Sequence, residues 1–270
     1  NAFRDYFRQI DVFKRVLAST NGAQQPGDED RWMKIRANAV EISSSIVIGD
    51  GEMLLNGWTL LSPVTPHLIR DKAYEEKVVL LTQLALYVCT FHYALEKVVE
   101  FVRISLDTIT GIQRGEYILS TARAEYTNPD DNYGFIVRYK PEGEAARFNS
   151  GSVRNNRNSI VSILGPSTSL RPDPTRIFAF KAIPPGIVNA ADLHAGRAVQ
   201  TDAEQHPRCV DIVAGIVAEI AVACRHIGHD DCDDLGALIA NHPVISLEEA
   251  LENTSLVSKV GNRLKKAVLS

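Results

Sequence analysis

Apolar residues recur at spacings of three and four in three separate stretches of the chain, and this spacing is typical of amphipathic helices. The stretches cover 1–19, 28–46 and 205–225. Their apolar stripes are Phe3, Phe7, Ile10, Phe13 and Leu17; Trp32, Ile35, Ala39, Ile42 and Ile46; and Cys209, Val213, Ile216, Ile220 and Cys224. A last helix is predicted from Ser246, because Ser246 and Glu249 have the spacing of a capping box.

Short apolar runs rich in β-branched and aromatic residues predict strands between the second and third helices. There are seven such runs: Leu55–Leu61, Lys77–Leu81, Leu84–Phe91, Lys97–Ile104, Glu116–Ser120, Tyr133–Lys140 and Arg176–Ile183. Only Thr82-Gln83 separates the second run from the third, which is short enough for a hairpin. The segment 141–174 carries Pro, Gly, Ser, Asn and Arg and predicts a mobile insertion.

These elements predict an α+β fold built on a seven-stranded antiparallel sheet. A flat sheet of that size would leave two edges bare, and bare edges invite association with other chains. A partly closed barrel plugged by helix 205–225 avoids this, which is the pleckstrin-homology-like arrangement, here with a C-terminal helix and two preceding N-terminal helices. We predict boundaries that separate helices over 1–50, the barrel over 51–225, and a loop with the last helix over 226–270.

Composition and charge narrow the function classes. The chain has 29 Lys and Arg against 33 Asp and Glu, a formal net charge of −4, which argues against a general nucleic-acid-binding protein. No apolar run reaches the roughly 18 residues that a membrane span needs. The 4 cysteines are too scattered for a secreted disulfide scaffold, so we expect a cytoplasmic setting. The start at Asn1, without Met or a signal sequence, predicts a piece of a longer protein.

Several segments carry a family resemblance: Asn1–Gln9, Asn56–Pro63, Glu75–Thr82, Leu86–Cys89, Leu95–Val98, Ile109–Ile112 and Gly134–Tyr139. The first resembles the helix that closes the catalytic domain of Sac-type phosphoinositide phosphatases, best matched by fungal members. The others resemble the Sac-homology module that follows this domain in one branch. The resemblance implies that 1–50 is a catalytic-domain tail with a connector. It also implies that the module is pleckstrin-homology-like and supports dimerisation.

The catalytic loop of that family is missing from this chain. Sac phosphatases attack phosphate with a Cys thiolate in a Cys-x5-Arg-Thr loop, where a lowered pKa activates the sulfur and Arg holds the phosphoryl oxygens. Six positions after the cysteines stand Leu95, Gly215, Asp230 and Leu238. We therefore predict no catalytic residue and no cofactor in this chain. It is either the C-terminal portion of a phosphatase or a relative that has lost the enzyme.

Two basic regions are candidate lipid-binding sites. The first is the loop between the first two predicted strands, where a pleckstrin-homology-like fold often receives a phosphoinositide headgroup. The second is 134–181, where basic residues outnumber acidic ones and would face an anionic lipid surface. The candidates are His67, Arg70 and Lys72 in the first, and Arg138, Lys140, Arg147, Arg154 and Arg157 in the second. The alternatives are an ordinary charged loop, because Asp71 lies among the cations, and a solvated insertion.

A metal site is the weaker candidate. Cys224, His226, His229 and Cys232 offer two thiols and two imidazoles, the ligand types of zinc. Their spacing, Cys-x-His-x2-His-x2-Cys, matches none of the usual zinc templates. We therefore expect no metal and a solvated acidic loop.

The residues and the resemblance together predict a non-catalytic regulatory and interaction module of a phosphoinositide phosphatase. We expect it to be peripheral on cytosolic membrane faces, where it mediates homodimer formation, contact with an anionic phosphoinositide surface, or both. Two alternatives stay open: a purely structural dimerisation domain without lipid binding, and part of an active phosphatase whose catalytic half lies upstream. Neither a nucleic acid nor a transmembrane segment is expected.

Overall fold

The structure is a computed structural model that describes residues 28–121, 126–141, 148–149, 175–183, 208–227 and 238–252. The chain divides into two compact units. The first contains 1–59, 77–108 and 139–176, and the second contains 60–76, 109–138 and 177–270. The predicted first helix, 1–19, and most of the predicted insertion lie outside the described residues. The predicted boundaries at 50 and 225 stay a prediction.

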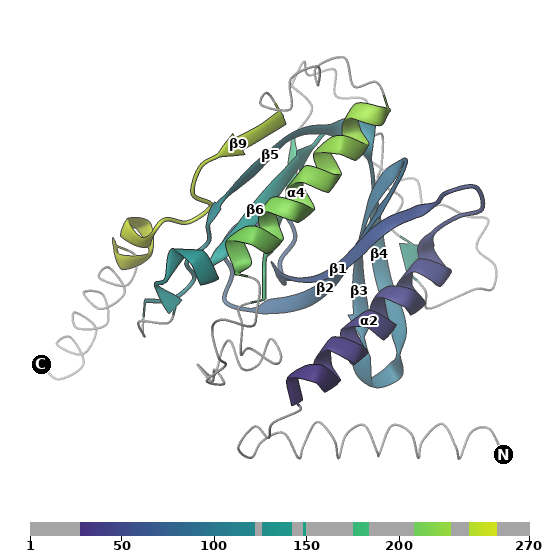
Figure 1. The fold of residues 1–270 in the computed structure, drawn as a ribbon, viewed down its shortest axis with the longest axis horizontal. Helices are drawn as coiled ribbons and strands as arrows, with labels where there is room; N and C mark the ends of the chain where they lie inside the picture. Colours follow the sequence, from purple (N-terminus) through teal and green to yellow (C-terminus); the bar gives the residue numbers. More distant parts are fainter. Residues whose placement is uncertain are drawn as a thin grey trace, which may run out of the picture. The chain divides into compact units, whose positions relative to one another are not determined.

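Nine strands form one mixed sheet within the described residues (Figure 1). They are β1 (Leu54–Pro63), β2 (Tyr74–Thr82), β3 (Ala85–His92), β4 (Lys97–Ser105), β5 (Ile109–Glu116), β6 (Tyr133–Tyr139), β7 (Phe148–Asn149), β8 (Arg176–Lys181) and β9 (Ile239–Asn241). Their order is β7-β4-β3-β2-β1-β8-β6-β5-β9. The α+β class is confirmed. The sheet is open, however, because its two edge strands, β7 and β9, do not pair with each other. The prediction of a partly closed seven-stranded barrel is therefore wrong.

The edge strands explain why the sheet can stay open. β7 comes from the predicted insertion and pairs with β4, and β9 comes from the predicted loop over 226–245 and pairs with β5. Both are short, and short edge strands limit edge-to-edge association. The β5–β9 pair is parallel, which the all-antiparallel prediction missed.

Six of the seven predicted strands are confirmed, including the β2–β3 hairpin, in which Leu81 pairs with Leu86. The fifth, Glu116–Ser120, is wrong: the strand is β5, which ends at Glu116. Tyr117 and Ile118 are fully buried, which explains their apolar pattern. Their N–H groups, however, donate to the carbonyls of Asn132 and Ile245, in connecting segments outside the named strands.

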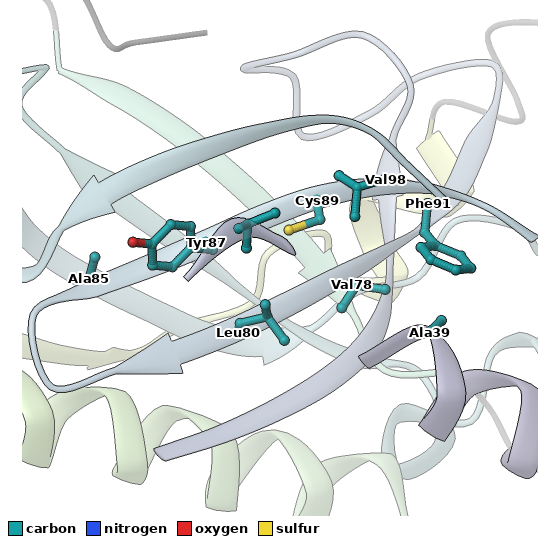
Figure 2. Packing of buried hydrophobic residues seen from close by; sticks show 9 residues of the cluster. Ala39, Val78, Leu80, Ala85, Tyr87, Cys89, Phe91 and Val98 are labelled. Atoms are coloured by element: carbon teal, nitrogen blue, oxygen red, sulfur yellow. The ribbon is translucent and has the colours of Figure 1, made fainter. Parts of the chain in front are cut away.

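In the first unit, helix α2 (Asp28–Val47) packs on β3 and β4. Figure 2 shows the core, where Val78 and Leu80 of β2 meet β3 side chains and Ala39 of α2. The predicted stripe of α2 holds at Trp32 and Ala39, which are buried, but Ile46 is 55% exposed. Val47 is buried in its place, because the helix turns a slightly different face to the sheet than the stripe indicates.

In the second unit, helix α4 (Cys209–His226) packs on β5, as Figure 1 shows. All five residues of its predicted stripe are buried. The last helix begins at Leu247. Ser246 precedes it, and its Oγ accepts a hydrogen bond from the N–H of Glu249 at 3.2 Å. This is the N-cap half of the predicted capping box.

Gly115 of β5 is a position where only glycine fits. A Cβ there would lie 2.3 Å from the carbonyl oxygen of His242 and 2.7 Å from Cα of Pro243, both backbone atoms. We expect Gly115→Ala to lower the free energy of unfolding by about 1–3 kcal/mol, because the chain after β9 must move away. Urea unfolding measures this.

Gly215→Ala is the matched control for that substitution. Gly215 lies in the interior of α4, and a Cβ there meets nothing within 4 Å. The control should raise the unfolding free energy by about 0.5–1 kcal/mol, because alanine is the better helix former. Equal effects of the two substitutions would contradict the close approach at Gly115.

Candidate functional site

The candidate site is the loop over 64–73, which joins β1 to β2 in the second unit. Its ends are tied by the N–H of Val64, which donates to the Ala73 carbonyl at 3.1 Å. Inside the loop, the Asp71 carboxylate accepts from the N–H groups of Thr65 at 2.7 Å and Lys72 at 2.6 Å. These bonds, with one from the Thr65 side chain first among them, lower the pKa of Asp71. The carboxylate therefore stabilises the loop from within.

His67 fastens the loop to β8. Its backbone is left-handed, with φ +66°. Its Nδ1 lies 2.9 Å from the carbonyl oxygen of Ile177, and its ring packs edge-on against Phe178 with centroids 5.7 Å apart. A carbonyl oxygen only accepts, so Nδ1 carries the proton in this bond. The predicted headgroup ligand thus has a structural contact through one of its two ring nitrogens.

A third attachment is the carbonyl of Ile69, on which two tyrosine hydroxyls converge. Tyr74 donates to it at 3.3 Å, and Tyr117 donates to it from the segment that follows β5. The Tyr74 hydroxyl also accepts from the N–H of Asp71 at 3.3 Å. Burial raises the pKa of both tyrosines, so both stay protonated donors at neutral pH.

The remaining loop side chains are turned toward solvent. Val64 is 46% exposed and Leu68 is 43% exposed. Pro66 and Lys72 are also exposed, and Arg70 is half-buried. The loop therefore combines an exposed apolar set with two cations, while its one acid is held by internal hydrogen bonds.

Of the other predicted cations, the structure describes Arg138 and Lys140. Arg138 lies on β6 and donates to Oε1 of Gln113 on β5 at 2.5 Å. Lys140 is exposed and belongs to the first unit. Arg147, Arg154 and Arg157 lie outside the described residues.

The described cysteines are poor nucleophiles. Cys89, Cys209 and Cys224 are buried, and burial raises the pKa of Cys89 and of Cys209 to about 12. An activated thiol has the opposite shift.

The described residues include only part of the predicted metal site. Of the four, Cys224 and His226 are described, and His229 and Cys232 are not. Searching the described parts of the chain finds no cluster of three or more His, Cys, Asp or Glu that could hold a metal ion. In those same parts, no helix combines the length and apolarity that membrane crossing requires.

Lys181, which sequence reasoning counted in the basic segment, is a fully buried residue at the end of β8. Its Nζ donates to the Tyr117 carbonyl and to Oδ1 of Asn132, each at 2.9 Å. Burial lowers its pKa to about 7, against weaker opposing effects of Cys209 and Asp131. It fixes the segments around β8 and is not part of a lipid-facing surface.

One comparison with known proteins covers the part of the chain that contains the candidate loop. Residues 28–140 match the family model hSac2, described as an inositol phosphatase. No curated protein matches the chain. Among solved structures, the hSac2 domain from human phosphoinositide phosphatase Sac2 matches with 14% identity and a TM-score of 0.37, covering 71% of this chain and 82% of that chain.

The family match identifies residues 28–140 as an hSac2-type segment, and the assignment rests on that match alone. It confirms the resemblance to Sac-related phosphoinositide phosphatases that the sequence segments between Asn56 and Tyr139 carry. All of β1 to β6 and the loop over 64–73 lie inside the matched segment.

Sequence reasoning found the cations of the loop but missed the residues that hold it. Tyr74 and Tyr117 carry no sequence signal that separates a hydroxyl donor from an ordinary core aromatic. For Lys181 there was a signal: it ends the run Arg-Ile-Phe-Ala-Phe-Lys, where alternation places it on the same face as Ile177 and Ala179.

The burial of Lys181 predicts a pH-dependent stability. Its pKa is about 7 when folded and 10.5 ordinarily, so the unfolded chain binds more protons between these values and stability rises with pH across that window. Lys181→Met should remove this rise. The test is to measure the midpoint of urea unfolding at several pH values between about 6.5 and about 9.5, which lie mostly within the window between the two pKa values.

Lys97→Met is the control, because Lys97 is an exposed lysine on β4. It should keep the wild-type dependence of the midpoint on pH. If wild type and Lys181→Met show the same dependence, then Lys181 is not the group responsible.

Proposed function

We propose that this chain is a non-catalytic module of a phosphoinositide phosphatase and that it contacts anionic membrane lipid through the loop over 64–73. The observation that carries the proposal is the hSac2 family match over 28–140, which includes this loop. The parent protein then supplies the catalytic loop from another segment. The proposed lipid contact implies that the chain attaches peripherally to cytosolic membrane faces.

The chemistry of the described residues supports a non-catalytic role. The Sac-type phosphatases that the sequence resembles attack with a thiolate, whereas burial raises the pKa of Cys89 and Cys209. No Cys-x5-Arg pattern occurs in the sequence. A contribution of this chain to catalysis would therefore act through placement of the enzyme at its substrate.

The charge arrangement of the loop supports lipid contact. Arg70 and Lys72 are the loop cations that can approach lipid phosphates, and they outnumber the one ionised carboxylate of the loop, Asp71, which bonds to the Thr65 and Lys72 N–H groups. Each cation close to an anionic surface contributes about 1 kcal/mol. Two cations are a weak attachment by themselves, so a specific headgroup contact has to be tested directly.

Vesicle co-sedimentation tests this function. Vesicles of phosphatidylcholine with phosphatidylinositol 4-phosphate should pellet the chain at physiological salt, and phosphatidylcholine alone should pellet less of it. Arg70→Gln/Lys72→Gln should lower the affinity for the first vesicles by about thirtyfold, because two surface cations of about 1 kcal/mol each are lost. Equal pelleting of wild type on both vesicles would remove headgroup recognition from the proposal.

Self-association is a second function that a separate observation favours. Exposed apolar side chains gather where α2 leads into β1 and at the β2–β3 hairpin: Met53 (61%), Leu54 (38%), Leu55 (46%) and Leu84 (43%). Gln83 joins the two places, since its Oε1 accepts from the N–H of Met53 at 2.5 Å and its Nε2 donates to Gly51 at 3.1 Å. An exposed apolar set of this kind is typical of an interaction surface.

Light scattering on the isolated chain tests self-association. Wild type should have the mass of a dimer, and Leu55→Glu/Leu84→Glu should have the mass of a monomer, because a buried unpaired carboxylate in an interface is costly. Met33→Glu is the control, since Met33 is an exposed apolar residue of α2, at 51%. A wild-type monomer at all concentrations would contradict this second function.

A further inference from the structure

We propose that the loop over 64–73 inserts Val64, Pro66 and Leu68 into the apolar boundary of an anionic lipid bilayer, with Arg70 and Lys72 at the phosphate level. This inference rests on the proposed membrane function and assigns the loop a mode of binding that the cations alone do not define. It makes His67 a positioning residue of the loop, in place of a headgroup ligand.

The first argument is that some loop residues attach the loop to the fold while the apolar residues among them are exposed. His67 and Ile69 attach the loop to β8 and to two tyrosines, and Asp71 bonds to the loop backbone at the surface. The apolar residues between and before them are exposed: Val64 by 46% and Leu68 by 43%, with Pro66 exposed as well. The apolar side chains are thus held outward by residues that attach the loop to the fold.

The second argument is preorganisation. A loop that becomes ordered only on the membrane loses binding energy to conformational entropy. Here the Asp71 carboxylate, the Ile69 carbonyl and the His67 ring already fix the backbone at three places. Insertion therefore requires no folding step, and the apolar surface can transfer into lipid at little entropic cost.

The third argument concerns the occupant. Exposed Val and Leu side chains alone would suit any apolar partner. The cations within the same ten residues, Arg70 and Lys72, outnumber the ionised Asp71 carboxylate and add complementarity to anionic headgroups. Adjacent apolar and cationic groups match the layering of a bilayer, whose acyl boundary lies beneath a phosphate layer.

The test uses the whole chain and vesicles of phosphatidylcholine with phosphatidylserine. Val64→Ser/Leu68→Ser should lower the partition coefficient by about tenfold or more, because the transfer of two half-exposed side chains into lipid is lost. The matched control is Val222→Ser/Leu251→Ser, which removes one Val and one Leu of the same unit, exposed by 43% and 51%. The control should bind like wild type.

A second measurement reports insertion itself. Leu68→Trp should show a blue-shifted emission and quenching by brominated acyl chains when anionic vesicles are added, above the signal of wild type. The binding of wild type should fall only partly at high salt, since salt screens cations and leaves apolar transfer in place. Binding of Val64→Ser/Leu68→Ser should fall to background under the same conditions.

The outcomes separate this inference from the function on which it rests. If wild type pellets with anionic vesicles, the Ser pair pellets equally well and Leu68→Trp is not quenched, insertion is wrong and electrostatic membrane contact stands. If wild type pellets with no vesicle, both fail. If Val64→Ser/Leu68→Ser has a lower mass than wild type in light scattering without lipid, the loop binds a second copy of the chain, and insertion is overturned.

Discussion

The burial of one ammonium group constrains the whole second unit. Lys181 is 0% exposed, and such a group is tolerated only when its protons meet acceptors. Both acceptors come from segments without regular structure: the Tyr117 carbonyl after β5 and the Asn132 side chain before β6. The lysine therefore sets the position of Tyr117 relative to β8.

From Tyr117 the constraint extends to the candidate loop. The Tyr117 hydroxyl donates to the Ile69 carbonyl, so the residue that receives Lys181 on its backbone also holds the loop with its side chain. Gly134 shares this packing, because a Cβ there would lie 2.5 Å from the Tyr117 ring and 2.4 Å from the Phe180 carbonyl oxygen. The loop is thus held by the core of its own unit, which is why its exposed residues have a defined presentation.

The sequence predicted best those elements in which buried positions recur at the period of the secondary structure. The β2–β3 hairpin and the stripe of α4 are of this kind, because each apolar position contacts the core. The prediction of the fifth strand failed because Tyr117 and Ile118 are buried in a hydrophobic core cluster, which produces the apolar pattern, while their N–H groups make only single backbone bonds to connecting segments. β9, with only three residues, has too short a pattern to detect.

The candidate site shows the same division between residue type and residue role. Sequence located Arg70 and Lys72, because charge is visible in the letters. It could not assign His67, since its bond to the Ile177 carbonyl joins residues 110 positions apart. For Lys181 the alternation along β8 indicates burial, but its acceptors on Tyr117 and Asn132 are distant in the sequence, so its role could not be predicted.

The two proposed surfaces use different residues, which lie in different units. Met53, Leu55 and Leu84 belong to the first unit, and Val64 and Leu68 belong to the second. One loop with three exposed apolar side chains and two cations would give weak membrane attachment by itself. A dimer carries two such loops, and when both reach one bilayer the second attachment is intramolecular and gains from a high effective concentration. Self-association would then convert a weak lipid contact into stable recruitment of the phosphatase, which gives both surfaces one purpose.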